Sequence, residues 1–247
     1  MNLVLLDRHE VDDTGAVRLS GPRAEHLVRV LKVASGHEVR LGLVDGPLGV
    51  GTVQSVEEGT VTVRCVFGGS APPRPRVDLL LALPRPKVMR RLWAQIAALG
   101  VGRVLVTNAE RVERNYFDAH VLEPATYRAL LIEGLQQARD TRVPVVSIHR
   151  QFKILVEDEL DGLFDGGLRL VADPGATRAA RTVAREAGVG RMLLAVGPEG
   201  GWNRFELDLL ERHGFEQIGM GARTLRTDTA CVALLALVHD ALAVRGH

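Results

Sequence analysis

Short stretches of alternating hydrophobic and polar residues dominate the first 67 positions of the chain. We predict strands at 39–43, 51–56 and 60–66, because the side chains of a half-buried strand repeat every two residues. Turn-forming segments at 45–47 and 57–59 separate them at about the spacing of a small β-barrel. One helix is expected among these strands, at about 22–33.

The segment 68–76 interrupts this pattern. It has no periodicity and contains three prolines, which fix the backbone and donate no hydrogen bond to a sheet. We therefore interpret it as a linker and predict two domains, 1–72 and 73–247.

Beyond the linker, strands alternate with helices. Strands are predicted at 77–83, 104–107, 143–148, 168–172, 191–196 and near 217–219, and helices at about 87–99, 124–138, 178–187, 204–213 and 227–244. Gly100 follows the first of these helices, at the position where glycine commonly ends a helix. This alternation indicates an α/β fold with a largely parallel sheet.

Composition narrows the class of protein. With 46% hydrophobic and 25% charged residues, the chain is an ordinary globular one, which excludes a disordered or disulfide-dependent protein. No apolar run approaches the roughly 20 residues of a membrane span, and no signal peptide is visible, so we expect a cytoplasmic protein with no membrane partner. Cys65 and Cys231 are expected to be reduced core residues. The net charge of +1 means that any RNA contact must come from a local patch.

The most unusual stretch is Gly197-Pro198-Glu199-Gly200-Gly201, which follows an apolar strand. Asn203 and Glu206 then predict a capped helix start. The stretch is either a tight strand-to-helix turn or a ligand site, since glycines leave the main chain open and ligands bind outside the carboxyl ends of strands. It matches neither a P-loop nor a dinucleotide fingerprint.

A second unusual stretch covers residues 219–230. Thr227 is predicted to cap the last helix, and Asp228 lies in its first turn, where the helix dipole favours a carboxylate. Arg223 and Arg226 either pair with a carboxylate or contact a ligand.

Together these two stretches resemble the carboxy-terminal signature of the RsmE family, the 16S ribosomal RNA (uracil-N3)-methyltransferases of the SPOUT superfamily. The resemblance covers nearly the whole chain. Further matches are His26-Leu27-Val28-Arg29-Val30-Leu31-Lys32, Leu83-Pro84-Arg85-Pro86-Lys87 and Gly134-Leu135-Gln136-Gln137-Ala138-Arg139. It implies a SPOUT-type parallel sheet with a C-terminal trefoil knot, an N-terminal PUA-like β-barrel that binds RNA, and a homodimer.

The resemblance also implies S-adenosyl-L-methionine as cofactor, bound within the knot. The positions that match the cofactor loops are Ala172, Pro174, Gly197, Pro198, Glu199, Gly200, Gly201, Gly219, Gly221, Leu225, Arg226 and Thr227. The implied substrate is ribosomal RNA, and recognition by folded shape favours the assembled small subunit, because aromatic residues are too few for a stacking platform.

Methylation at N3 of uracil requires loss of the N3 proton, which a base or a cation near the ring oxygens assists. Arg226 is the expected cation, with Arg223 as the alternate. Asp228 is the nearby candidate base, although capping also explains it. No metal is expected, since the histidines lack ligand spacing.

Candidate RNA-binding residues are basic side chains of both predicted domains, which would hold phosphates while the uridine is flipped out. They are Arg23, Arg29, Lys32, Arg85, Lys87 and Arg139, together with Arg90 and Arg91.

Ala98, Gln136 and Asp228 depart from the family pattern, which has glutamate at each of these positions. These departures motivate a second hypothesis, a non-catalytic RNA-binding or assembly module with the same fold. A third is a SPOUT methyltransferase that acts on a different RNA.

Overall fold

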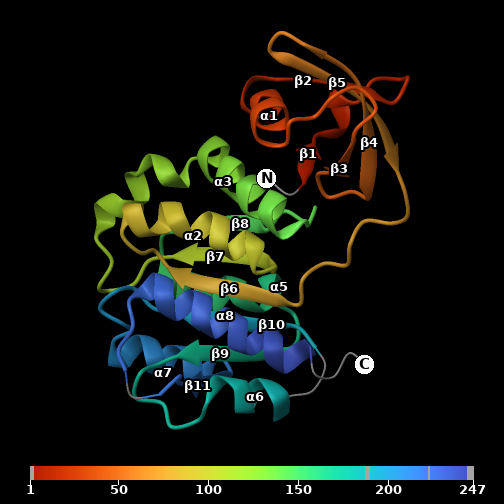
Figure 1. Ribbon diagram of the computed structural model, residues 1–247. Helices are drawn as coiled ribbons and strands as arrows, with labels where there is room; N and C mark the ends of the chain where they lie inside the picture. Colours follow the sequence, from red (N-terminus) through yellow and green to blue (C-terminus); the bar gives the residue numbers. More distant parts are fainter. Residues whose placement is uncertain (1–2, 187–189, 222, 244–247) are drawn as a thin grey trace. The chain divides into compact units, whose positions relative to one another are not determined.

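The computed structural model describes residues 3–186, 190–221 and 223–243, and divides the chain into two compact units (Figure 1). The first unit runs to Arg74 and also contains Leu131–Val143. The second contains Pro75–Leu130 and the chain from Pro144 onward. The segment between Phe67 and Val77 has no helix or strand, as predicted for the linker. The assignment of 1–72 and 73–247 as domains stays a prediction.

The first unit is built on a five-stranded sheet in the order β1-β3-β4-β5-β2. The pair β1 and β3 is parallel, and the other pairs are antiparallel. The strands are β1 (Val4–Leu6), β2 (Ala16–Ser20), β3 (Glu38–Leu43), β4 (Leu48–Glu57) and β5 (Thr60–Phe67). The three predicted strands are thus confirmed as β3, β4 and β5, whereas β1 and β2, which form the edges of the sheet, were not predicted individually.

The helix predicted at 22–33 is shorter than expected. It consists of α1 (Gly21–Glu25) and a π-helical turn at His26–Val30, and it ends before Leu31. Ala24 and Leu27 lie in the core together with the inward-facing residues of the sheet.

Residues 131–143 complete the first unit through hydrogen bonds to the turn between β3 and β4. The Thr141 hydroxyl donates to the Gly46 carbonyl at 2.6 Å, and the Asp45 amide donates to the Thr141 carbonyl at 2.8 Å. Thr141 is fully buried. A Cβ added to Gly42 would lie only 2.7 Å from the methyl carbon of Thr141, so the two residues are closely packed. This segment is therefore an integral part of the small unit.

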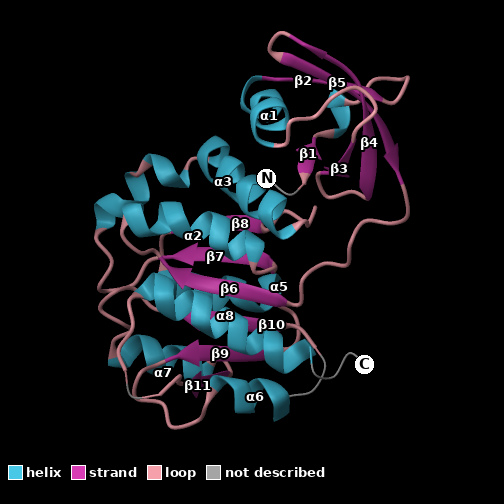
Figure 2. Cartoon of the chain, viewed as in Figure 1, coloured by secondary structure: helices cyan, strands magenta, loops and turns pink. Residues whose placement is uncertain are grey.

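The second unit has a six-stranded sheet in the order β11-β9-β10-β6-β7-β8, with every pair parallel (Figure 2). This confirms the predicted α/β fold. The strands are β6 (Val77–Ala82), β7 (Val101–Thr107), β8 (Val145–His149), β9 (Leu168–Ala172), β10 (Met192–Val196) and β11 (Phe215–Ile218). Every residue of β6 and β10 is buried, as expected for central strands covered on both faces.

The helices of this unit agree with the prediction within a few residues. They are α2 (Pro86–Ala98), α6 (Ala180–Glu186), α7 (Arg204–Arg212), α8 (Thr227–Ala243) and the first half of α3 (Pro124–Ala138), whose residues from Leu131 onward belong to the first unit. Short helices α4 (Phe152–Ile154) and α5 (Leu160–Leu163), joined by a π-helical turn, were missed. The predicted helix ends at Ala187 and Val244 lie outside the described residues.

Helices α2 and α8 lie across one face of the parallel sheet (Figure 1). The α2 helix buries Met89, Trp93 and Ile96, which recur at intervals of three and four residues, and Gly100 follows it with φ of +79° as predicted. Cys231 is buried within α8 and Cys65 within the first unit, both as free thiols, which confirms that prediction. Within the described ranges, no helix is long and apolar enough to cross a membrane.

Candidate active site

A cavity of about 290 Å³ opens at the carboxyl ends of β9, β10 and β11 in the second unit. This is the edge of a parallel sheet at which ligands bind. Its wall is formed by the loops that follow these strands, by the start of α8 and by Arg111. The lining residues are Arg111, Ala172, Asp173, Pro174, Val196, Gly197, Pro198, Glu199, Gly200, Gly201, Trp202, Ile218, Gly219, Met220, Gly221, Arg223, Thr224, Leu225, Thr227, Ala230 and Leu234.

The glycine-rich loop after β10 forms a tight turn that leads into α7. The Gly201 amide donates to the Pro198 carbonyl at 2.8 Å, and Gly201 has φ of +70°, a conformation that favours glycine. The predicted helix cap is confirmed: the Asn203 side chain accepts from the Glu206 amide at 2.8 Å, and the Glu206 carboxylate accepts from the Asn203 amide at 2.7 Å.

Glu206 also ties this loop to the one after β7. Its side chain is buried, and its second carboxylate oxygen accepts from the Glu110 amide at 2.7 Å. One carboxylate therefore accepts hydrogen bonds from two main-chain N–H groups of different loops and connects these two loops of the cavity wall.

Two further contacts hold the glycine-rich loop from the side of the neighbouring strands. The Arg85 amide, directly before α2, donates to the Glu199 carboxylate at 3.1 Å. The Arg111 guanidinium donates to the Gly200 carbonyl. Glu199, expected from the family resemblance to bind cofactor, thus also caps the N-terminus of α2, a position that a helix dipole favours for a carboxylate.

The loops after β9 and β11 are packed directly on each other. The Asp173 amide donates to the Ile218 carbonyl at 3.0 Å, and the Gly219 amide donates to the Arg178 carbonyl at 2.9 Å. A Cβ on Gly219 would lie 2.8 Å from the Ala176 carbonyl oxygen, so only glycine fits this approach.

The cavity wall leaves main-chain donors available to a ligand. Among the described residues, the N–H groups of Glu199, Gly200 and Gly221 have no hydrogen-bond acceptor. Apolar side chains of Val196, Ile218 and Leu234 face the same space. A flat, largely apolar ligand with polar edges, such as adenosine, fits this combination of groups.

The predicted cofactor-binding residues come together almost completely. All of them line the cavity except Arg226. The Arg226 carbonyl accepts the first hydrogen bond of α8, from the Ala230 amide at 2.8 Å, so Arg226 occupies the helix-cap position. The prediction that Thr227 caps this helix is therefore wrong by one residue: Thr227 is the first residue within it and is buried.

The predicted catalytic residues occupy different environments. Arg223 is exposed and lines the cavity. Asp228 forms an ion pair with Arg91 of α2, with 2.7 Å between Oδ2 and the guanidinium nitrogen. The hydrogen bond from Arg91 lowers the pKa of the Asp228 carboxyl, which opposes a role as proton acceptor near neutral pH.

Some of the predicted RNA-binding residues are held in ion pairs, and others are exposed. In the first unit, Arg23 forms an ion pair with Glu10, and Arg29 pairs with Glu25 at 2.8 Å, whereas Lys32 and Arg139 are exposed with positive φ. In the second unit, the side chains of Arg85, Lys87 and Arg90 are exposed and form no ion pair with a described residue, while Arg91 is engaged by Asp228.

Several residues of the cavity wall were not predicted. Arg111 comes from the loop after β7, and Leu234 from the second turn of α8. Neither lies near a glycine-rich motif, so only the order of the strands brings them to the site. Among the described residues, no group of three or more His, Cys, Asp or Glu side chains is placed to hold a metal ion.

Comparison with known proteins identifies the class. Residues 71–239 match the family model of the RNA methyltransferase domain. Ribosomal RNA small subunit methyltransferase E of Treponema pallidum is 29% identical over 241 residues, covering 96% of this chain and 90% of that protein. The protein of the same name from Mycobacterium bovis is 30% identical over 229 residues, covering 92% and 87%. The chain therefore belongs to this RNA methyltransferase family, in the branch whose members are named ribosomal RNA small subunit methyltransferase E.

A solved structure shares the fold across the full length. It is a ribosomal RNA small subunit methyltransferase E from Neisseria gonorrhoeae bound to S-adenosyl methionine, with a TM-score of 0.75. The sequences are 20% identical, and the match covers 97% of each chain.

Proposed function

We propose that this protein transfers a methyl group from S-adenosyl-L-methionine to N3 of a uridine in 16S ribosomal RNA of the small subunit. The proposal depends on the cavity at the ends of three neighbouring strands, where main-chain N–H groups are available to a ligand. The chain that forms this cavity belongs to the RNA methyltransferase family. The names of its relatives and the cofactor bound to the Neisseria gonorrhoeae protein support it.

The three loops are proposed to hold the cofactor. The open N–H groups of Glu199, Gly200 and Gly221 would bind its polar edges, and Ile218 and Leu234 would pack on its apolar surface. When bound, S-adenosyl-L-methionine supplies an electrophilic methyl group. The role of the chain is then to position the reacting nitrogen in line with that group and to stabilise the charge that develops on the base.

Arg223 is the better supported of the two predicted cations, because it lines the cavity. Arg226 stays a candidate through the family resemblance, with its carbonyl engaged as the cap of α8. Asp228 is held as a carboxylate by Arg91, so we assign it to positioning α8 against α2.

Further parts of the proposal concern architecture and partners. We propose that 1–72 is a PUA-like RNA-binding domain, that 73–247 is the catalytic domain with a trefoil knot at the cofactor loops, and that two copies form a homodimer. A ribosomal RNA substrate supports a cytoplasmic location. Arg29, Lys32, Lys87, Arg90 and Arg139 are the proposed phosphate contacts.

A single assay tests the activity. The purified protein is incubated with labelled S-adenosyl-L-methionine and small ribosomal subunits from a strain that lacks the endogenous enzyme. Nuclease digestion and mass spectrometry should identify 3-methyluridine in the 16S RNA. Cofactor binding without methyl transfer to any RNA would support the non-catalytic module instead, and transfer to a different RNA would support the third hypothesis.

Arg223→Ala and Arg226→Ala should be compared in this assay. Loss of the cation that stabilises the uracil anion should lower turnover by about 100-fold or more. Arg212→Ala is a suitable control, because Arg212 lies on α7 and is absent from the cavity wall.

A further inference from the structure

Two arginines from different loops reach the same part of the glycine-rich loop. Arg85 follows β6 and contacts Glu199 through its amide, and Arg111 follows β7 and contacts the next residue, Gly200, through its guanidinium. Tyr116, in the 3₁₀ turn Arg114–Asp118, interacts electrostatically with both Arg85 and Glu199. We call Arg85, Arg111 and Tyr116 the cavity rim.

Arg111 is held in place while most of its hydrogen-bonding capacity stays open. Its guanidinium donates to the Gly200 carbonyl, and its aliphatic part lies against Gly200, where an added Cβ would be 2.7 Å from Arg111 Cδ. It forms no ion pair with any carboxylate of the described chain, in contrast to Arg91, which is bound to Asp228. A guanidinium carries five N–H donors, so several remain for a ligand in the cavity that Arg111 lines.

Tyr116 offers an aromatic ring in the 3₁₀ turn that follows Arg111 in the chain. Its hydroxyl donates to Glu113 Oε1 at 3.0 Å, which orients the ring. Partial burial and the Glu113 carboxylate raise the pKa of the Tyr116 hydroxyl, so the ring is neutral near neutral pH.

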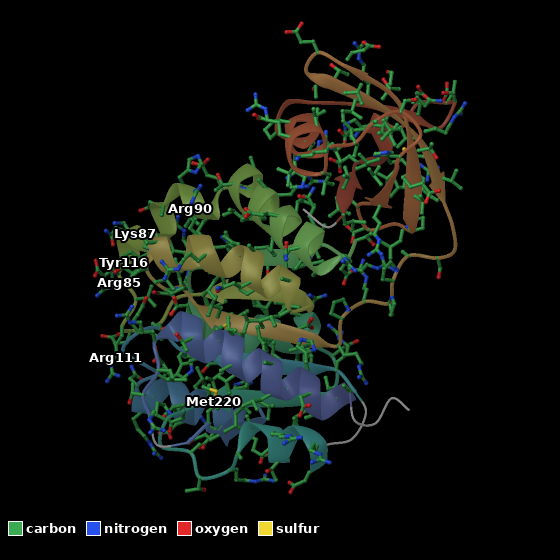
Figure 3. The ribbon with its side chains drawn as sticks, viewed as in Figure 1. Arg85, Lys87, Arg90, Arg111, Tyr116 and Met220 are labelled. Atoms are coloured by element: carbon green, nitrogen blue, oxygen red, sulfur yellow. The ribbon has the colours of Figure 1, made fainter. Side chains whose placement is uncertain are left out.

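Figure 3 shows where the rim lies in the second unit. Arg111, Arg85 and Tyr116 occur along one margin, together with Lys87. Met220, which lines the same cavity, lies further inward. Of the three rim residues Arg111 lines the cavity, while Arg85 and Tyr116 lie along the same margin, near the basic residues at the start of α2.

We propose that the cavity rim is the subsite for the nucleotide that is methylated, with the Arg111 guanidinium at a ring oxygen of its uracil and the Tyr116 ring stacked on a base of the RNA strand. The proposal rests on the proposed function and deepens it. A pyrimidine nucleotide fits because the reacting uracil develops negative charge on its oxygens, and Arg111 supplies a positive charge at the mouth of the cavity.

The uracil anion carries its charge on two ring oxygens, so Arg111 at one of them acts beside the cation proposed at Arg223 or Arg226. The N3 proton leaves to solvent, and the resulting negative charge spreads onto the two ring oxygens. The N3 electron pair would then form the new N–C bond as the C–S bond of the methyl donor breaks, and the electron pair of the broken C–S bond would stay on sulfur. Arg111 lowers the free energy of the anion, so a larger fraction of bound uracil is deprotonated near neutral pH.

The test compares Arg111→Ala with the matched control Arg114→Ala on the same loop. Turnover of small ribosomal subunits is measured at saturating S-adenosyl-L-methionine across a pH series, and cofactor affinity is measured by calorimetry. The charged groups near Arg111 are Glu110, Glu113 and Arg114 on its own loop, and Arg85 and Glu199 on facing loops.

Arg111→Ala should lower turnover at neutral pH by about 100-fold or more. Its turnover should then rise about tenfold per pH unit toward the pKa of uracil N3, because without the cation the deprotonated fraction of bound uracil is set by the pH of the solution. Arg111→Lys, which keeps the charge but not the fork, should show intermediate turnover with the wild-type pH profile. Arg114→Ala should behave as wild type throughout.

Two results would overturn the assignment of Arg111. Wild-type turnover of Arg111→Ala would show that no anion is stabilised there. Weaker cofactor binding by Arg111→Ala with normal turnover at saturating cofactor would assign Arg111 to the cofactor instead. If the wild-type protein methylates no uridine, the proposed function itself fails, and the two failures are thus distinguished by the wild-type control.

Tyr116 is tested by the Michaelis constant for RNA. Tyr116→Ala should raise it about 10-fold, because stacking on an aromatic ring is lost, and Tyr116→Phe should leave it nearly unchanged. Equal effects of the two substitutions would mean that the hydrogen bond to Glu113, and not the ring face, is what matters, and would remove Tyr116 from the subsite.

Discussion

Replacement of Glu206 by alanine should destabilise the second unit more than any other single change on α7. The carboxylate accepts two hydrogen bonds of 2.7 Å, from the amides of Asn203 and Glu110, and its side chain is 3% exposed. A hydrogen bond to a charged group contributes about 1.5–3 kcal/mol. The two amides are only partly buried and recover water in the variant, so we take the lower end for each and expect a loss of about 3 kcal/mol.

Tryptophan fluorescence gives a selective assay for this prediction. Both tryptophans of the chain, Trp93 and Trp202, lie in the second unit, so their emission follows that unit alone. Urea unfolding of wild type and Glu206→Ala should yield the loss of about 3 kcal/mol, and heating should lower the midpoint by about 6–12 °C for a chain of this size. Cofactor affinity should fall as well, because Glu206 holds two loops of the cavity wall.

Asp208→Ala is the matched control. Asp208 lies two residues further along α7 and pairs with Arg204 at 2.9 Å, but both side chains are exposed, so its removal should cost less than about 1 kcal/mol. If Glu206→Ala is no more destabilising than Asp208→Ala, the two buried hydrogen bonds do not hold the loops and the reasoning is refuted.

Three other predictions concern neighbouring parts of the second unit. The pKa of Asp228 is lowered in the folded protein, so its ion pair with Arg91 stabilises the fold above the unfolded pKa of about 3.9. This stability is lost as the pH falls through the folded pKa. Asp228→Asn should therefore be less stable than wild type at pH 7 in urea unfolding, and equally stable at the acid limit. Burial raises the pKa of the Cys231 thiol to about 12, so alkylation at about pH 8 should modify it only after unfolding, and rapid labelling of the folded protein would contradict this. Gly219→Ala places a Cβ 2.8 Å from the Ala176 carbonyl oxygen, which should cost about 1–3 kcal/mol in unfolding free energy and weaken cofactor binding measured by calorimetry; unchanged binding would show that the two loops can separate freely.

The sequence predicts the parallel sheet of the second unit well, since most of its strands carry a local apolar run. The predicted cap at Asn203 and Glu206 is also confirmed, because both partners lie three residues apart. Strand β1 has only three residues and is defined by its pairing with β3, a contact that no local pattern shows. The helices at 152–163 were not predicted, because a π-helical turn between them interrupts the helical period of the sequence.

In the candidate site too, local motifs predicted some residues, whereas others are placed there only by the tertiary structure. The glycine-rich motifs and the family resemblance lead to the loops after β9, β10 and β11. Arg111 carries no motif, and its place at the cavity follows from the order β10-β6-β7, which brings the loop after β7 near the glycine-rich loop. The cap at Arg226 was misplaced by one residue because threonine is the more common capping residue, whereas the tertiary position of the loop decides where the helix begins.

The hydrogen bonds from Thr141 to the turn at Asp45 and Gly46 have a consequence for biosynthesis. A nascent chain that has been translated only as far as the proline-rich segment cannot yet bury Gly42 or satisfy that turn. The amino-terminal sheet reaches its final form only after residue 143 has left the ribosome, when two strands of the other sheet, β6 and β7, have already been synthesised. Exchange of the amino-terminal part between relatives would accordingly require two separate pieces of gene, and a swap at the linker alone should yield a chimera with an unfinished small unit.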